Sequence, residues 1–591
     1  MKLSAALIMM TAAGIASAGD APPDIALLHG YIHTEDAQRT VVRAMALRGN
    51  SVVAIGSDET IAAMVGAQTR TIDLHGRTVL PGIIDAHTHP AQSAQDLDKC
   101  SLHDRMMGPK AIKTHLMQCL RDNPGAPSQW FEVIQVNPSG LMLTRALLDS
   151  IVRHRPMVLS GADGHSAWAN SAALRAAHIN AATPDPAGGR IERDPSGRPT
   201  GTLRDNATDI LFAAMPAAGL DLESARLARA FDAMRATGIT SVQDADVDEH
   251  VMQIYKWLYD EHRLNMRVRG SFRLADLHES PQRLIDQAVH FRDRWAIAPD
   301  SLRADAVKIF ADGVIEYPSQ TAALLEPYLD AHGKPTHNLG PSYFTQENLN
   351  QIVSLANAAG LTVHIHAIGD RAVRSALDAF AFSRLHNGDL DSRDQIAHLE
   401  LINPADFPRF RQLAVIANLQ LLWAERDDYI DRATVKYLGP ERSRYLYAAR
   451  SLRDAGAVIA GGSDWGVSSF NAFEAMEHAI TRAEAPGKPP LLPEQAIGIQ
   501  DAVDAYTIHA AFALKQERTT GSLEVGKRAD FIVVDRDVFA IEPAQLHETR
   551  VLSTYLDGHE VYASADGTIG NLAMARTVRV KPMGNTEVIN P

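Results

Sequence analysis

The stretch 81–89, Pro-Gly-Ile-Ile-Asp-Ala-His-Thr-His, ends in two histidines that are separated by one residue. In a β-strand the side chains of positions i and i+2 face the same side, so His87 and His89 can both reach one metal ion. The pair alone is a weak signal, because surface histidines also occur at this spacing by chance. It predicts a metal site only if other parts of the chain supply further ligands.

Lys308 interrupts the apolar run 306–310, which has the pattern of a buried strand. A buried and unpaired ammonium group costs several kcal/mol, so this lysine needs a carboxylate partner or a modification. Carbamylation by CO₂ would turn the side chain into an anion that can bridge two metal ions. The alternative is a surface lysine on a segment that is not a strand. Asp312, just beyond this run, is a further candidate for substrate binding.

Three more candidate ligands end apolar runs later in the chain. His366 and His398 end two runs that are one βα unit apart, and Asp464 follows the last candidate strand. A core histidine that is satisfied by backbone groups is the ordinary alternative for either histidine alone. Two histidines at successive strand ends are harder to explain in that way.

Histidine and carboxylate ligands in this number suit zinc, with manganese, iron or nickel as alternatives. A bound divalent metal lowers the pKa of its water from ~15.7 toward ~7, which supplies hydroxide at neutral pH. Asp464, beside that water, could take its proton and pass it to a leaving amine. We therefore expect one or two metal ions per chain.

The elements that must position these residues alternate between apolar runs and helical patterns such as 349–359 and 370–383. Eight such units predict a (β/α)8 TIM-type barrel, in which catalytic residues lie at the carboxyl ends of the strands. The candidate strands are 83–86, 239–243, 266–272, 306–310, 361–365, 395–399, 415–419 and 457–461.

The two ends of the chain both have short β-like runs, from 24 to 55 and from 529 to 556. Such segments can form one small sheet domain if the middle forms a closed unit whose termini meet. The stretch 91–237 is too long for one crossover and must hold an insertion, in which the Pro- and Gly-rich part 183–201 indicates a loop or hairpin.

We therefore predict an α/β fold: a barrel, a large insertion after its first strand, and a small β-sandwich made by both ends of the chain. The predicted segments are a signal peptide at 1–18, the sandwich at 19–80 and 515–566, the barrel at 81–514 with its insertion at about 91–237, and a tail at 567–591.

Composition narrows the choice of partners. The chain is 46% hydrophobic and 22% charged, which is ordinary for a globular enzyme. A net charge of −14 argues against nucleic acid or an anionic membrane and leaves a small molecule as the expected partner. A homodimer is the expected oligomer, because dimers are the most common oligomers of soluble proteins.

The N-terminus has the pattern of a secretory signal. Lys2 precedes an apolar stretch at 5–15, and Ala-Ser-Ala at 16–18 fits a cleavage site before Gly19. The alternative, a first buried helix, is disfavoured by the two prolines that follow. No later run reaches the ~18 apolar residues of a membrane span. We expect a secreted or periplasmic protein that does not insert in the membrane after cleavage.

The two cysteines, Cys100 and Cys119, could form one disulfide in an oxidising compartment, which the sequence cannot decide. Their spacing does not match a thiolate zinc site.

Several stretches of the sequence, in their order along the chain, resemble the amidohydrolase superfamily, and specifically the amidohydrolase-3 (YtcJ-like) family that includes N-substituted formamide deformylases. The resemblance spans about residues 24–562. It is carried by the stretches 71–77, 81–89, 163–170, 307–313, 321–325, 366–372, 398–400, 462–464 and 521–530.

The resemblance implies a hydrolase of carbon–nitrogen bonds other than peptide bonds, with two metal positions. The first metal is then bound by His87, His89 and Asp464, and carbamylated Lys308 bridges to a second metal bound by His366 and His398.

The resemblance also implies that His165 and Trp168, in the inserted region, line the substrate pocket. His165 could polarise the scissile carbonyl, and a core position is the alternative for Trp168. The chain departs from the family pattern at 421–423, where a proline is usual after Gln420, and at 312–317, which is longer and more acidic. These departures leave the substrate open.

Rival functions differ in the residues that they need. A serine hydrolase is disfavoured because Gly461–Trp465 lacks the final glycine of a nucleophile elbow. An inactive binding protein would be expected to have lost a ligand or Asp464, and none is missing. A one-metal deaminase or an esterase on the same fold remains the alternative, against which Lys308 offers a bridging anion.

Overall fold

The computed structural model describes residues 21–564, apart from residues 104, 106, 123, 127–128, 138–142, 162–165, 187–188, 206, 217, 275–278, 318 and 427–429. The predicted signal peptide and the predicted tail lie outside the described residues. Within the described residues, no helix combines the length and the apolarity that crossing a bilayer requires.

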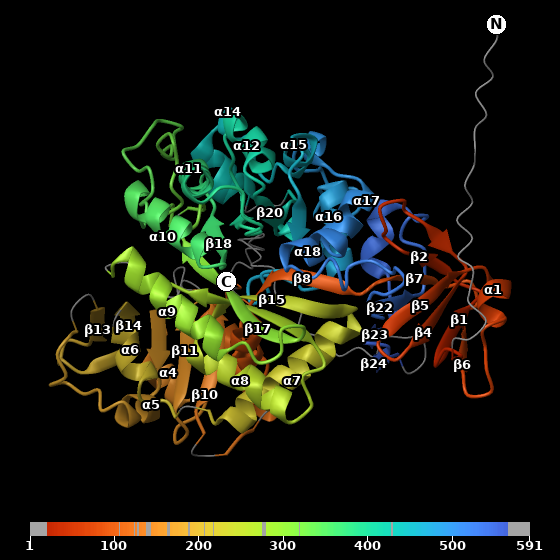
Figure 1. Cartoon of the computed structure of the whole chain (residues 1–591). Helices are drawn as coiled ribbons and strands as arrows, with labels where there is room; N and C mark the ends of the chain where they lie inside the picture. The colour runs from red at the N-terminus through yellow and green to blue at the C-terminus, as the bar shows by residue number, and fades with distance from the viewer. Residues whose placement is uncertain are drawn as a thin grey trace, which may run out of the picture.

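The centre of the chain is a parallel sheet of eight strands in sequence order, and its last strand lies beside its first, so that it curls into a near-closed barrel (Figure 1). The strands are β8 (Ile83–Thr88), β15 (Ile239–Val247), β16 (Arg267–Arg273), β17 (Leu302–Phe310), β18 (Thr362–Ala367), β19 (Gln395–His398), β20 (Ile416–Leu419) and β21 (Ile459–Gly461).

The eight predicted barrel strands are confirmed, although β15 and β17 are longer than predicted. The added start of β17 contains Arg303 and Asp305, whose side chains form a 3.2 Å hydrogen bond between Nε and Oδ2. These charged residues interrupt the apolar run at the start of β17. A prediction from apolar residues alone therefore starts the strand too late.

Helices cover the outside of the barrel. In α9, Ser280 accepts a hydrogen bond from the backbone N–H of Arg283, and Pro281 occupies the first turn, where its missing N–H is not needed. Its apolar residues recur every three or four positions and are buried. The helices around the barrel are α7 (Leu220–Ala236), α8 (Glu249–Asp260), α9 (Pro281–Arg294), α10 (Gln346–Ala358), α11 (Asp370–Asn387), α12 (Phe407–Gln412), α15 (Ala449–Asp454), α16 (Ala472–Thr481), α17 (Ile499–Ala505) and α18 (Ile508–Ala513).

The insertion between β8 and β15 contains a sheet of its own, in the order β13-β14-β12-β11-β10-β9. The Pro- and Gly-rich part is a hairpin, because β13 and β14 pair antiparallel. The elements are β9 (Cys100–Ser101), α3 (Pro109–Asp122), β10 (Phe131–Val136), β11 (Met157–Gly161), β12 (Ser166–Ala169), β13 (Gly189–Arg193) and β14 (Pro199–Asp205).

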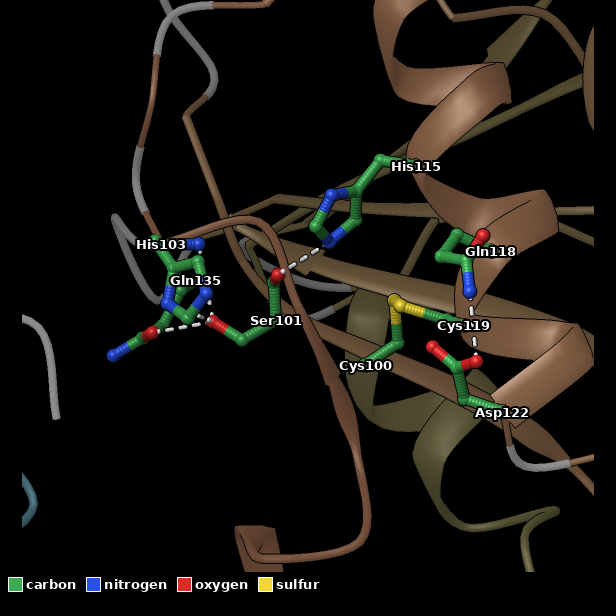
Figure 2. The surroundings of a disulfide bond; sticks show 8 residues. All are labelled: Cys100, Ser101, His103, His115, Gln118, Cys119, Asp122 and Gln135. Atoms are coloured by element: carbon green, nitrogen blue, oxygen red, sulfur yellow. Dashed lines mark hydrogen bonds between the residues drawn. A yellow bond between two sulfur atoms is a disulfide. The ribbon is translucent and has the colours of Figure 1, made fainter. Parts of the chain in front are cut away.

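A disulfide between Cys100 and Cys119 joins β9 to α3, with the two Cα atoms 5.8 Å apart (Figure 2). The ring of His115 lies beside it and donates a hydrogen bond from Nε2 to the carbonyl of Ser101 at 3.0 Å. The sulfur atoms are bonded to each other, so they offer no thiolate to a metal ion.

The two ends of the chain share a β-sandwich, whose red and blue strands lie together at one side of the barrel (Figure 1). One sheet has the order β5-β4-β1-β6 and the other β24-β23-β22-β7-β2-β3, in which β22 pairs antiparallel with β7. The strands are β1 (Ile25–Leu28), β2 (Tyr31–His33), β3 (Val41–Val42), β4 (Ala44–Arg48), β5 (Ser51–Gly56), β6 (Arg70–Asp73), β7 (Thr78–Pro81), β22 (Phe531–Val534), β23 (Val551–Leu556) and β24 (His559–Ala563).

Apolar side chains from both sheets fill the space between them. Leu27 and Met45 of the first sheet belong to the same buried cluster as Phe531 and Tyr555 of the second. The predicted fold class, a barrel with an insertion and a sandwich made by both chain ends, is therefore confirmed.

Candidate metal centre

Six predicted ligand residues meet at the carboxyl ends of the barrel strands. In a barrel strand every second side chain points into the barrel, so residues i and i+2 both face its interior. His87 is the fifth residue of β8, Lys308 lies in β17, His366 in β18 and His398 at the end of β19. His89 follows β8 directly, and Asp464 follows β21 after a short turn.

The Asp464 carboxylate lies close to both His87 and His89. Its Oδ1 is 3.1 Å from Nε2 of His89 and 3.6 Å from Nε2 of His87. Ligand atoms of His87, His398 and Asp464 all lie within 4.8 Å of one another, so that one metal ion could contact all three. The most compact set thus includes His398, which the family resemblance assigns to the second metal position.

Lys308 is fully buried within this group. Its Nζ is 3.3 Å from Nε2 of His87 and 4.9 Å from the centre of the Phe310 ring. Burial lowers the pKa of Lys308 from 10.5 to about 8, against the charges of nearby aspartates. The alternative of a surface lysine is excluded by this position.

The rings of His366 and His398 meet edge to face, with centres 4.5 Å apart. His366 donates from Nε2 to the carbonyl of Gly313 at 3.1 Å, and His398 donates from Nδ1 to Oε1 of Gln420 at 2.9 Å. Each ring then keeps one nitrogen lone pair for a ligand role. His398 and Leu399 have φ values of 76° and 52°, a left-handed conformation that such residues rarely adopt and that clusters at functional sites.

The charges of these groups fit a divalent cation. Burial, and then the charge of Lys308, lowers the pKa of His87 well below its usual value, and burial lowers that of His366 to about 4. Against the effect of burial, the hydrogen bond from His89 and the neighbouring cationic groups hold the pKa of Asp464 well below its usual range. Neutral imidazoles such as those of His87 and His366 are the ligand form that a metal ion requires, whereas the hydrogen bond to Asp464 raises the pKa of His89 against the effect of burial.

Asp85, which the sequence analysis missed, fixes the position of Asp464. Its carboxylate accepts hydrogen bonds from the backbone N–H of Ser463 at 2.9 Å and from the Ser463 hydroxyl at 2.5 Å. Asp464 in turn donates its backbone N–H to the carbonyl of His87 at 2.7 Å. The end of β21 is thus bound to the end of β8. A carboxylate two residues before His87 in a buried strand is the sequence signal for this role.

His364 holds the ring of His87 in place through a contact between their ring nitrogens. Nε2 of His364 lies 3.0 Å from Nδ1 of His87, and the other His364 nitrogen lies 3.0 Å from Nε2 of Gln243. Gln243 also donates to the hydroxyl of Ser271 at 2.9 Å. His364 lies two residues before His366 on the same strand face, and that spacing could have identified it.

Gln243 belongs to a chain of amides that continues down the barrel. Gln395 donates to Oε1 of Gln243 and to the carbonyl of Ala513, at 3.1 Å each. Asn418 donates to Oε1 of Gln395 at 2.8 Å and to the carbonyl of Ala86 at 2.9 Å. All three amide side chains are buried. The barrel interior below the metal centre is therefore polar and internally hydrogen-bonded.

A cavity of about 450 Å³ opens above the six ligand residues and contacts all of them. Its apolar wall includes Leu422, Trp423 and Ile430. The Trp423 ring stacks on His398 with centres 5.6 Å apart. Trp423 lies in the stretch where the chain departs from the family pattern, so this departure shapes the cavity.

Carboxyl groups form another part of the cavity wall. Glu316, Glu400 and Glu425 line it together with Tyr447, whose hydroxyl donates to Oε2 of Glu400 at 3.0 Å. Burial, and then the charge of Glu316, raises the pKa of Glu400 well above its usual value. Lys308 is the one basic Lys or Arg side chain among the described residues of this wall. These residues were not among the predicted site residues, because they lie in loops or just past strand ends and have no periodic pattern.

The other three predicted site residues are placed differently. The Asp312 carboxylate accepts backbone hydrogen bonds from Ala323, Ile368 and Gly369, so it organises the loops behind His366. Trp168 is 1% exposed in the core of the inserted sheet, which fits the alternative of a packing role. His165 lies outside the described residues.

Comparison with known sequences gives a match over most of the chain. The profile of the family described as "Amidohydrolase family" matches residues 70–562. An N-substituted formamide deformylase of Arthrobacter pascens is 30% identical over 559 residues, which cover 90% of this chain and 97% of that protein. The putative amidohydrolase YtcJ of Bacillus subtilis (strain 168) is 28% identical over 550 residues, which cover 90% and 98%.

Solved structures agree with the fold. An uncharacterised metal-dependent hydrolase from Pyrococcus furiosus has a TM-score of 0.70 at 23% identity and covers 87% of this chain and 99% of its own. The atrazine chlorohydrolase TrzN from Arthrobacter aurescens TC1, solved in complex with zinc, has a TM-score of 0.52 at 16% identity and covers 94% and 100%.

Proposed function

The chain belongs to the amidohydrolase family, and from that premise we propose that it hydrolyses the amide-type carbon–nitrogen bond of a small molecule by metal-dependent catalysis. The observation that supports this proposal most directly is the group of four histidines, Lys308 and Asp464 around one cavity. Imidazole and carboxylate ligands suit zinc, and the neighbour solved with zinc supports the same metal.

The proposed ligands are His87, His89 and Asp464 on one side and His366 and His398 on the other, with Lys308 between them. When bound, a divalent metal ion supplies Lewis acidity to a carbonyl oxygen and acidifies water. Asp464 accepts the proton of the attacking water and returns it to the leaving nitrogen. The bonds from Ser463 to Asp85 and from Asp464 to His87 hold Asp464 at this point.

A carbamate on Lys308 would complete the ligand set. Burial lowers the pKa of this side chain to about 8, which increases the share of neutral amine. The amine lone pair forms a bond to the carbon of CO₂, and the nitrogen loses a proton to the surroundings. The product is an anion, which is the form that a bridging ligand needs.

A screen with matched compounds tests the proposal. Purified protein is assayed with formamides, N-acyl amines, N-acyl amino acids, cyclic amides and esters, before and after chelation and then after zinc is returned. We expect hydrolysis of an amide that chelation abolishes and zinc restores. Activity that survives complete removal of metal would contradict the proposed mechanism. Release of ammonia from an aminated ring, with no amide hydrolysis, would favour the one-metal deaminase.

We also propose that the mature protein works outside the cytoplasm. The disulfide between Cys100 and Cys119 supports this location, because such bonds persist in oxidising compartments. N-terminal sequencing of the protein from a secreting bacterial host is expected to begin at Gly19. A mature chain that retains Met1 would overturn the proposed export.

A further inference from the structure

A second cavity, of about 310 Å³, lies at the amino-terminal end of the barrel, at the opposite end of the strands from the metal centre. It is lined by the starts of β16 and β17 and by the segment that follows α18. Its wall has more positive than negative side chains. The charged residues of the wall are Arg267, Arg303, Lys515 and Arg518 against Asp300 and Asp305.

Both carboxylates in this wall are already neutralised. Asp305 accepts hydrogen bonds from Nε of Arg269 at 2.6 Å and from Nε of Arg303 at 3.2 Å. Although burial opposes it, the Arg269 charge holds the pKa of Asp305 well below its usual range. Asp300 accepts a 2.6 Å hydrogen bond from Arg528, which is not part of the wall. Neither carboxylate needs the remaining cations of the cavity.

Two of the four cationic side chains already have hydrogen-bond partners. Arg267 is buried and hydrogen-bonds the carboxylates of Asp530 and Asp557. Arg303 donates to Asp305 and to the carbonyls of Pro299 and Leu514. The carbonyl of Leu514 belongs to the negative end of the α18 dipole. Because Arg303 binds this carbonyl, the helix dipole does not offset the remaining positive charge of the cavity.

Lys515 and Arg518 have no directly bonded counter-ion, because the carboxylates whose charges reach them are hydrogen-bonded to other arginines; these carboxylates are Asp305, Asp391 and Asp394. Within the described part of the chain, neither side chain forms an ion pair or a hydrogen bond. Beside them, Gln516 is 5% exposed, and its Oε1 is buried without a hydrogen-bond partner. A buried polar atom without a partner is costly, and Gln516 lines the cavity, so rotation of its amide toward a ligand there would satisfy Oε1.

We propose that this cavity binds inorganic phosphate. Lys515 and Arg518 supply the two positive charges that match a dianion, and charge-assisted hydrogen bonds to a tetrahedral oxyanion suit both groups. Phosphate at neutral pH also keeps at least one P–OH group, which donates to Oε1 of Gln516. Sulfate has the same shape and charge but no such donor, so it binds more weakly. A flat carboxylate such as acetate binds more weakly still.

Calorimetric titration of the intact protein tests this site. Phosphate, sulfate and acetate are titrated at constant ionic strength set with sodium chloride. We expect saturable binding of one phosphate, weaker binding of sulfate and little response to acetate. The double variant Lys515→Gln/Arg518→Gln is expected to weaken phosphate binding at least about tenfold. Arg518→Gln alone, at an exposed position, is expected to give an intermediate loss with no effect on folding.

Lys488→Gln is the matched control, because it removes one charge from an exposed lysine outside this cavity. The proposal is overturned if phosphate gives no saturable heat, or if the double variant binds it as tightly as the wild type. The second result would place the phosphate elsewhere, for example at the metal centre. Equal affinities for phosphate and sulfate would overturn the acceptor role of Gln516. Circular dichroism of each variant shows that its fold is intact.

Discussion

The Nζ atom of Lys308 lies 3.3 Å from Nε2 of His87, and both side chains are completely buried. An ammonium group at this distance would compete with a cation for the same ligand atom. A neutral amine or its carbamate would not. The metal content of the protein should therefore depend on this lysine.

We expect wild-type protein, purified without chelator, to contain about two metal ions per chain. Lys308→Ala should lower that content and reduce kcat/KM at least about a hundredfold, because the proposed bridge is lost. Adding a short carboxylic acid that fits the vacated space should restore part of both. Elemental analysis and steady-state kinetics measure the two effects. The control is Lys488→Ala on the surface; equal metal content in wild type and Lys308→Ala would rule out a bridging role.

Replacing Asp464 by asparagine keeps its size but removes its ability to carry a proton. Asp464→Asn should lower kcat/KM by about 10²–10⁴. The hydrogen bonds that Ser463 donates to Asp85 do not involve the Asp464 side chain, so the turn should keep its shape. The matched control is Asp454→Asn, on the exposed face of α15. Kinetics at wild-type metal content is the measurement, and a fully active Asp464→Asn enzyme would remove the proposed acid–base role.

The carboxyl groups in the cavity wall should select against anionic substrates. A substrate carboxylate placed near Glu316 meets the same negative charge that raises the pKa of Glu400, and like charge at close range costs several kcal/mol. For a pair of amides that differ only in a carboxylate or a carboxamide, we expect kcat/KM to favour the neutral compound at least about tenfold. Glu316→Gln should reduce this ratio, and Glu326→Gln, an exposed residue outside the wall, should not. A preference that is the same in both variants would show that Glu316 does not set it.

The pH dependence of stability should reflect Glu35, where the sandwich meets α17. Arg39 and Gln500 both donate to Oε2 of Glu35, at 2.8 and 2.6 Å. Burial, and then the charge of Asp504, raises the pKa of Glu35 from 4.5 to about 7. The folded protein therefore holds this proton more tightly than the unfolded chain. Its contribution to stability is complete below pH 4.5 and is lost as the pH rises to about 7.

Glu35→Gln has no proton to lose at this position. Its Tm relative to wild type should therefore increase between pH 4.5 and pH 7, in thermal melts at constant ionic strength. Glu59→Gln, at an exposed site, serves as the control. A Tm difference that does not change over this range would show that Glu35 keeps an ordinary pKa in the folded protein.

Much of the fold could be predicted because it depends on local patterns. The barrel strands are short apolar runs, and the ligand residues follow them directly, so strand ends and candidate ligands were found together. The sandwich shared by the two ends of the chain was predicted from their similar β-like patterns, but the pairing of β7 with β22 was not. The Cys100–Cys119 bond could not be predicted, because it depends on how α3 packs against β9.

The parts of the site that were missed depend on tertiary contacts. Glu400 and Tyr447 are neighbours only because the loops after β19 and β20 fold over the same cavity. Trp168 was a candidate for the substrate pocket, but its strand belongs to the inserted sheet, which buries it in a separate core. Chain order gives no information on which side of a sheet such a residue will face.

The amide chain below the metal centre has a consequence for how this barrel can change. The carbonyls of Ala86 and Ala513 can only accept hydrogen bonds, so they set the orientation of Asn418 and Gln395, and Gln395 sets that of Gln243. A substitution that exchanges donor and acceptor at one position would leave its neighbour mismatched. Sequence variation inside the barrel should therefore be strongly epistatic, with the interior amides changing as a set or not at all.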